Sequence, residues 1–301
     1  MRTTFALNRL RAFLLTLTLA MFGSAALAQS SAIEPCQATP TPAKPGLANL
    51  QENPTRVNTS VKETLVDSNI ADDPSVEKIL SPYAAKVRAL NVVIGSLEGE
   101  LKTSGIGANT MGQFVADGIS AAAAAKLGKP VVLAFTNASG LRKNFIPSGD
   151  LRASDIFELL PFENALVEID LTGTQVMSIL QKVTSGRDAQ AGARIHFRWN
   201  EQDRPELISA KLVDKMGRER EIEPNTTYTI VTIDYLLKVG GGAYAILQEG
   251  KNVKPLNLTI RDAVIDYVKS ETAAGRTIRP RLDDRFVQVG PSPARPENPR
   301  P

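Results

Sequence analysis

The sequence predicts an α+β domain with a mixed β-sheet and flanking helices. Helix-like and strand-like apolar patterns follow one another without the regular alternation typical of a doubly wound sheet. No glycine-rich phosphate loop follows the first predicted strand. We place this single domain at residues 61–289, a normal size for one hydrophobic core.

The predicted helices are recognised by their capping residues and apolar spacing. Pro74 occupies a favourable first-turn position in a helix over 73–89. A second helix begins at Asn109 or Thr110, includes Ala121–Ala125 and stops at Gly128.

Three later helices are also expected. Ser154 is predicted to cap a short helix, and Thr172 with Gln175 fits a capping box for the next one. The last predicted helix covers Thr259–Lys269.

The predicted strands are short apolar or alternating runs. Alternation predicts that one face of 165–171 is exposed, and that Ile195, Phe197 and Trp199 share the inner face of a further strand. Continuous apolar residues predict a buried strand over 131–136. The other strands are expected at 91–97, 207–213 and 228–232.

Both ends of the chain are expected to lie outside the domain. Residues 1–28 resemble a secretory signal peptide: three arginines precede the apolar run Ala12–Phe22, and Ala26-Leu27-Ala28 suits cleavage before Gln29. An uncleaved signal anchor is the alternative. The proline-rich residues 29–60 predict a flexible linker, and 290–301 a disordered tail. Export would place the mature chain in the periplasm or outside the cell.

Signal cleavage would remove the apparent basic character of the chain. Taking three arginines from 35 basic residues leaves 32, which equals the 32 acidic residues. Composition therefore gives no reason to expect a nucleic-acid polymer as partner. No membrane span is expected after cleavage. Cys36 is the single cysteine, so an internal disulfide is excluded.

Several short motifs occur in one colinear order. They are Val92–Leu97, Asn109–Gly112 with Val115–Asp117, Leu160–Phe162 with Ile169–Gly173, Pro224–Thr232, and Arg261–Tyr267. Over about 90–287 the chain resembles the C-terminal, substrate-specificity domain of 5'-nucleotidases. This resemblance implies that family's fold, a hydrolase-type role in nucleotide catabolism, and recognition of a nucleoside or nucleotide.

The resemblance also implies ligand-binding residues. The segment Asn137-Ala138-Ser139-Gly140-Leu141-Arg142 matches the family's Asn-Gly-Gly-x-x-Arg-like loop. Asn137 then has the place of the base- or ribose-binding amide, and Arg142 that of the phosphate-binding guanidinium, whose fork suits phosphate oxygens. The alternatives are a turn residue for Asn137 and a surface ion pair for Arg142.

Two aromatic side chains are candidates for stacking on the base. Phe162 matches the family's first stacking aromatic. Tyr235 matches the second if an insertion lies near Lys238; without one, Leu236 takes that place.

The family's Gly-Gly-Asp-Gly-Tyr loop is Gly240-Gly241-Gly242-Ala243-Tyr244 here. Gly240 and Gly241 match the family's loop, whereas Gly242 replaces the acid that would bind sugar hydroxyls.

The signatures of the family's two-metal catalytic domain are absent from the sequence. His196 is the single histidine, and its place on an alternating strand indicates a structural side chain. Asp117 and Asp155 fit helix ends better than a carboxylate pair. We therefore predict no catalytic residue and no cofactor in this chain, with divalent metals entering only through a partner.

Three functions remain open at this stage. The chain is a nucleotide-recognition module, inactive alone, that acts with a separately encoded metallophosphoesterase. Alternatively, it is a structural or interaction domain that kept the fold and lost the pocket. The third interpretation is an enzyme of new chemistry in the same cleft.

Overall fold

A five-stranded mixed sheet forms the centre of the computed structural model, which describes residues 63, 65–67, 69–238, 242 and 244–291. The strands follow in the order β12 (Lys251–Thr259), β6 (Ala165–Thr172), β11 (Thr227–Ile233), β3 (Ala134–Thr136) and β7 (Ala189–Ala191). The pair β11–β3 is parallel, and the other three pairs are antiparallel.

Strand direction brings four chain segments to one edge of this sheet. Strands β12, β11 and β3 all run towards that edge, while β6 begins there because it is antiparallel to β11 and β12. The residues that follow β3, β11 and β12, and those that precede β6, therefore meet at a single place.

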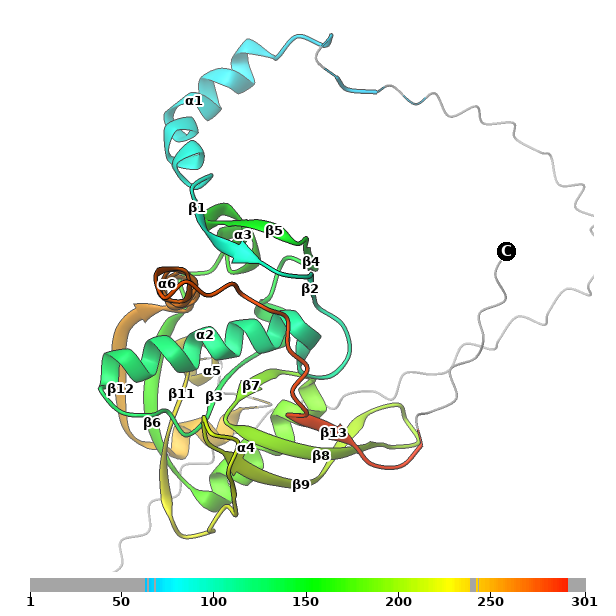
Figure 1. Cartoon of the computed structure of the whole chain (residues 1–301), viewed down its shortest axis with the longest axis vertical. Coiled ribbons are helices and arrows are strands. Elements are labelled where there is room, and N and C mark those ends of the chain that lie inside the picture. The colour runs from blue at the N-terminus through cyan, green and yellow to red at the C-terminus, as the bar shows by residue number, and fades with distance from the viewer. Residues whose placement is uncertain (1–62, 64, 68, 239–241, 243, 292–301) are drawn as a thin grey trace, which may run out of the picture. The chain divides into compact units, whose positions relative to one another are not determined.

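Three helices, α2, α4 and α6, pack against the sheet (Figure 1). Helix α2 (Asn109–Leu127) packs against α6 (Ile260–Ala273) and against β3 and β7. Helix α4 (Gly173–Gly186) contacts β6, β11 and the second sheet. Fully buried side chains, including Met111, Ile119 and Phe135, fill the space between these layers.

The second sheet has four strands, where we expected one mixed sheet in all. It contains β10 (Glu219–Arg220), β9 (Pro205–Val213), β8 (Ala193–Trp199) and β13 (Phe286–Gln288). Burial alternates along β8, with Ile195 and Phe197 inside, as predicted.

The remaining strands form two small ribbons, and the short helical segments of the described residues are two α-helices and three 3₁₀ turns. The ribbons pair β1 (Val93–Leu97) with β5 (Gly149–Arg152), and β2 (Leu101–Lys102) with β4 (Phe145–Ile146). The short helices are α3 (Ala153–Leu159), α5 (Asp234–Lys238) and the 3₁₀ turns at Ile106–Ala108, Ala138–Gly140 and Ala245–Glu249.

Two predicted helix ends are confirmed. Thr172 and Gln175 form the expected capping box at α4, and Gly128 ends α2 in the left-handed conformation. The prediction of Ser154 as a cap is wrong. Helix α3 begins one residue earlier, and the carboxylate of Asp155 accepts the backbone N–H of Arg152 instead.

Three further predictions need correction. The face of β6 expected to be exposed is partly covered, because the strand lies between β11 and β12, and Glu168 is buried. Strand β3 begins at Ala134 rather than residue 131. Asp117 lies in the middle of α2, not at its end, and forms an ion pair with Arg285 at 3.0 Å.

Helix α1 (Pro74–Ala89) differs from the other long helices because none of its residues is buried. Asp73 caps it, and Pro74 lies in its first turn, as predicted. Among the described residues, no helix is both long and apolar enough to cross a membrane. The predicted signal peptide and linker, and all but two residues of the predicted tail, lie outside the described residues.

Burial of α2 can be tested with two matched isoleucines. Ile119 in α2 is fully buried, whereas Ile79 in α1 is 68% exposed. We expect Ile119→Ala to lower the free energy of unfolding by about 2–5 kcal/mol, because it removes apolar contacts and leaves a cavity. Urea denaturation measures this, and Ile79→Ala is expected to change it by about 0.5 kcal/mol or less. Equal losses in the two variants would contradict the described packing of α2.

Candidate functional site

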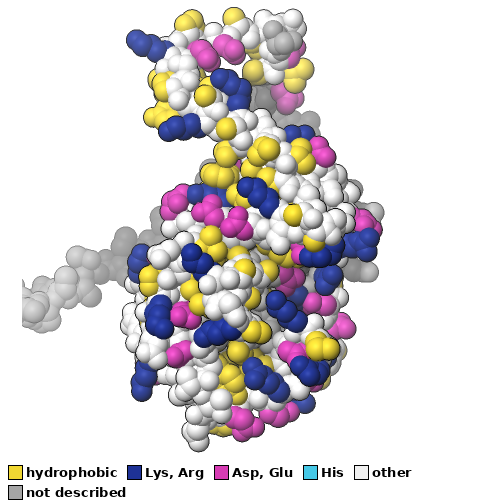
Figure 2. Space-filling model, turned by 60° about the vertical axis from the view of Figure 1, so that its left-hand side comes forward, with side chains coloured by type: hydrophobic (Ala, Val, Ile, Leu, Met, Phe, Trp, Pro, Cys, Tyr) yellow, Lys and Arg dark blue, Asp and Glu magenta, His cyan; other side chains and the backbone are white. Residues whose placement is uncertain are grey.

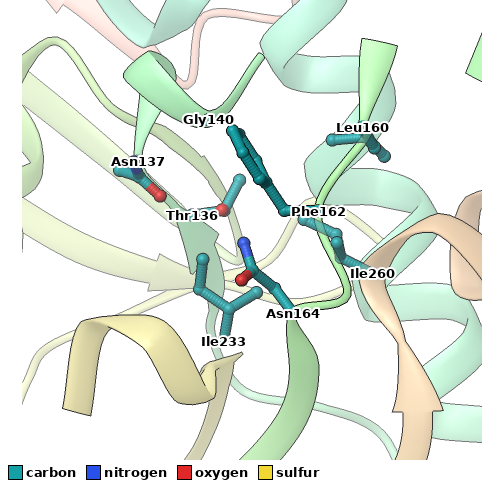
Figure 3. Close-up of a pocket in the computed structure, with 8 residues that line it drawn as sticks. All are labelled: Thr136, Asn137, Gly140, Leu160, Phe162, Asn164, Ile233 and Ile260. Carbon is teal, nitrogen blue, oxygen red and sulfur yellow. The ribbon is translucent and has the colours of Figure 1, made fainter. Parts of the chain in front are cut away.

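A pocket lies at the sheet edge where the four chain segments meet. Thr136 ends β3, Ile233 ends β11, Asn164 precedes β6, and Ile260 follows β12. The other residues that line it are Asn137, Gly140, Leu160 and Phe162. Figure 3 shows these side chains grouped around one space, with the ring of Phe162 extending across it towards Gly140. The pocket thus contains three of the predicted ligand residues.

The side-chain amide of Asn137 is held beside this pocket with one unsatisfied atom. Its Nδ2 donates to the hydroxyl of Ser139 at 2.7 Å, whereas its Oδ1 is buried and has no hydrogen-bond partner among the described residues. A Cβ on Gly140 would lie 3.3 Å from that Oδ1, which is a tight contact. Glycine at 140 therefore leaves room for the amide, and a buried acceptor without a donor costs about 1–3 kcal/mol.

Phe162 and Arg142 contact each other. The ring of Phe162 is 43% exposed although it belongs to the pocket wall. The guanidinium carbon of Arg142 lies 5.2 Å from the centroid of that ring, a cation–π contact. Arg142 has no carboxylate within ion-pair distance among the described residues, so the predicted alternative of a surface ion pair is not realised there.

The pocket is nearly closed in this conformation. The enclosed space measures about 10 Å³, which is room for about one water molecule. Pockets for small organic ligands typically measure about 300–1,000 Å³. A ligand the size of a nucleoside therefore does not fit the pocket in this conformation.

A buried arginine holds the segment that carries Phe162. Arg261, at the start of α6, is 7% exposed and donates through Nη1 to the carbonyl of Leu160 at 3.4 Å. Its Nη2 also pairs with the carboxylate of Glu163, and its guanidinium lies 4.2 Å from the ring centroid of Phe157. Arg261 thus binds the backbone before Phe162 and the side chain after it, which holds this segment against the start of α6.

A buried carboxyl group lies directly behind the Asn137 turn. Asp188 is 8% exposed, and its two oxygens accept the backbone N–H of Ala138 and the hydroxyl of Tyr244, each at 2.7 Å. Burial raises the pKa of Asp188, while these two hydrogen bonds oppose the shift. Burial and the neighbouring carboxylate raise the pKa of Tyr244, which keeps its hydroxyl protonated as a donor.

The second predicted stacking aromatic is not part of the pocket wall. Tyr235 lies on α5 two residues beyond Ile233, and it is 44% exposed. Leu236, the alternative, is buried in the core.

In the glycine-rich loop, Gly240 and Gly241 lie outside the described residues. Gly242 has φ +125°, a conformation that favours glycine.

Metal-ligating residues are not grouped in the described part of the chain. No cluster of three or more His, Cys, Asp or Glu side chains there could hold an ion. His196 faces Ser209 across β8 and β9, with 3.4 Å between its Nδ1 and the serine hydroxyl. Asp155 acts at the start of α3, as predicted.

Comparison with known families now decides the relationship. The family model for the 5'-nucleotidase C-terminal domain matches residues 90–249, which is more than half of the chain. The chain belongs to this family. The family assignment and the fold class predicted from the sequence are therefore both confirmed.

Relatives in the 5'-nucleotidase C-terminal domain family are longer proteins. The chain is 24% identical over 236 residues to the trifunctional nucleotide phosphoesterase protein YfkN of Bacillus subtilis. It is 26% identical over 198 residues to protein UshA of Yersinia enterocolitica. These matches cover 74% and 65% of this chain, but 16% and 34% of the two relatives. This chain therefore corresponds to about a third or less of each relative.

Solved structures in this family share the fold. A 5'-nucleotidase precursor from Thermus thermophilus superposes with a TM-score of 0.61 at 22% identity, over 72% of this chain and 43% of that one. The NAD nucleotidase of Haemophilus influenzae gives a TM-score of 0.52 at 18% identity, over 72% and 42%. At these identities the similarity shows the fold alone.

Several residues of the site were not foreseen from the sequence. Thr136, Asn164, Ile233 and Ile260 line the pocket because four strand ends meet, which no local motif reveals. Asp188 forms its contacts with residues 50 and 56 positions away. Arg261 was noticed only as part of a helix motif.

Proposed function

We propose that this chain is a nucleoside- or nucleotide-recognition module of nucleotide catabolism. The observation that carries the proposal is the buried Oδ1 of Asn137, which has no partner in the described part of the chain and lies in the wall that also contains Phe162. A nucleobase offers both an N–H donor for this oxygen and a flat face for the ring. The donor would remove the cost of the unsatisfied acceptor, so the site favours a ligand of this chemistry.

Arg142 supplies the charge that a phosphate group needs. Its guanidinium lies over the Phe162 ring, and it has no acidic partner among the described residues. We propose that the base displaces the guanidinium from the ring and that Arg142 then binds the phosphate through paired N–H donors. Tyr235, Gly240, Gly241 and Gly242 remain proposed ligand contacts from the family resemblance.

Phosphate cleavage is proposed to need a separate metallophosphoesterase domain or chain. The proposal rests on the family relationship and on the absence of a metal-ligand cluster from the described residues. Basic and acidic side chains are interspersed over the face shown in Figure 2, which gives no basic stripe there for a nucleic-acid polymer. The second candidate, a scaffold without a ligand, is favoured by the nearly closed pocket and by Gly242 in place of an acid.

The stacking role of Phe162 can be tested by calorimetry with adenosine. Stacking of a base on an aromatic ring contributes about 1–3 kcal/mol, so we expect Phe162→Ala to raise Kd roughly 5- to 150-fold. Phe145→Ala is the matched control, because Phe145 is 45% exposed and lies outside the pocket. Absence of any heat with the wild-type chain at millimolar adenosine would favour the scaffold function.

The phosphate-binding role of Arg142 predicts a difference between two ligands. Hydrogen bonds to charged groups contribute about 1.5–3 kcal/mol, so we expect Arg142→Ala to raise the Kd of AMP roughly 10- to 150-fold. The Kd of adenosine is expected to stay unchanged in Arg142→Ala, because adenosine has no phosphate and removal of the guanidinium leaves the Phe162 ring uncovered.

Arg220→Ala is the control for Arg142→Ala, since the guanidinium of Arg220 also lies over an aromatic ring, that of Tyr228, at 5.7 Å. Equal losses for AMP and adenosine in Arg142→Ala would contradict phosphate binding. Phosphate release from AMP by the purified chain alone, abolished in Arg142→Ala, would contradict a module that only recognises.

Export to the periplasm or the cell exterior is also proposed, from the signal-like residues 1–28. We expect mass spectrometry of the chain produced in its own host to find Gln29 at the amino terminus. A mature chain that still begins with residue 1 would contradict cleavage and would favour the signal-anchor alternative.

A further inference from the structure

Asp188 joins two segments of the site that are far apart in the sequence. It lies between α4 and β7, and its Oδ1 accepts the N–H of Ala138, the residue after Asn137. Its Oδ2 accepts the hydroxyl of Tyr244, the last residue of the glycine-rich segment 240–244. One carboxyl group therefore contacts the turn that carries the amide and the end of the loop that follows α5.

The surroundings of Asp188 fix its carboxyl group in place. A Cβ on Gly186 would lie 2.5 Å from its Oδ2, so the carboxyl packs directly against that glycine. The ring of Tyr244 lies 5.3 Å from the ring of Phe135, on the strand that leads to Asn137. No basic side chain forms an ion pair with Asp188 among the described residues, so its two neutral donors are the partners that the structure gives it.

Burying a carboxyl group without a cation costs free energy, so we look for a role of Asp188 that offsets this cost. An apolar side chain could fill the same space without that cost. What the carboxyl adds is direction, because it accepts two hydrogen bonds from two separate segments and so fixes their relative position.

We propose that Asp188 is the positioning residue of the ligand pocket. By holding the Asn137–Gly140 turn against Tyr244, it keeps the amide oxygen of Asn137 directed at the ligand. Asp188 is not among the residues that line the pocket, so it acts through Ala138 and Tyr244 rather than by touching the ligand. This inference rests on the proposed nucleoside binding.

The test compares variants that remove different parts of this link. Asp188→Ala removes both acceptors, and Tyr244→Phe removes one donor while keeping the ring. Asp188→Asn keeps the shape and an oxygen that can accept the Ala138 N–H, so it is the conservative rescue. Asp170→Asn is the matched control, because Asp170 also accepts two hydrogen bonds, from Thr229 and Asn252, away from the pocket.

Two measurements are made on the purified full-length mature protein. Amide hydrogen exchange, resolved by NMR without ligand, reports whether the N–H of Ala138 is protected. Calorimetry with adenosine reports Kd. We expect Asp188→Ala to accelerate hydrogen exchange at the N–H of Ala138. We also expect it to raise the Kd of adenosine about tenfold or more, the loss that corresponds to one hydrogen bond. Asp188→Asn and Asp170→Asn are expected to stay within about threefold of wild type.

The outcomes separate this inference from the proposed function. If the wild type binds adenosine and Asp188→Ala binds it equally well, the positioning role is refuted while nucleoside binding stands. If the wild type binds no adenosine, the proposed function fails and the positioning role fails with it, whatever the exchange rates.

A second variant covers the case in which Asp188→Ala does not fold. Tyr244→Phe is then decisive, because it keeps the packing of the ring at 244 and is expected to raise the Kd of adenosine several-fold. If Tyr244→Phe binds like the wild type and Ala138 exchange is unchanged, the inference is overturned.

Discussion

The pairing of β6 with β11 is the constraint on which this domain depends. These neighbouring strands pair over seven residues, from Thr227 with Thr172 to Ile233 with Leu166. Because the pair is antiparallel and β3 is parallel to β11, the end of one strand and the beginning of another must lie side by side. The pocket is a consequence of that geometry, since Asn164 and Ile233 enter it directly from the two strands.

The buried core also holds in place the two chain segments that form the walls of the site. Phe135, fully buried in β3, is followed at once by Thr136 and Asn137, so the recognition turn begins on a rigid strand. Arg261 holds the opposite wall from the start of α6. Phe162 is 43% exposed and Arg142 contacts its ring, so we expect the site to open by rotation of these two side chains rather than by movement of the backbone.

Local sequence signals predicted local structure well, and the site only in part. Thr172 and Gln175 lie three residues apart and satisfy each other's backbone, so the start of α4 was readable from the sequence. The family motif gave Asn137, Gly140 and Phe162, which the structure brings together. By contrast, the Asp117–Arg285 pair joins residues 168 positions apart, and no periodicity reports such a contact. Asp188 is similar, because its role depends on where two distant segments come to rest.

The backbone at Gly242 limits which side chains this position can carry. A Cβ there would meet no atom within 4 Å, so space alone does not prevent an aspartate from taking the place it has in the family's loop. The backbone does, since φ +125° is a conformation that side chains with a Cβ rarely adopt, at a cost of about 1–3 kcal/mol. A single substitution back to the acid would strain the loop before it gained a sugar contact. An aspartate at 242 would therefore carry this backbone cost in the conformation described, and the cost would offset part of what a contact with a sugar hydroxyl gained.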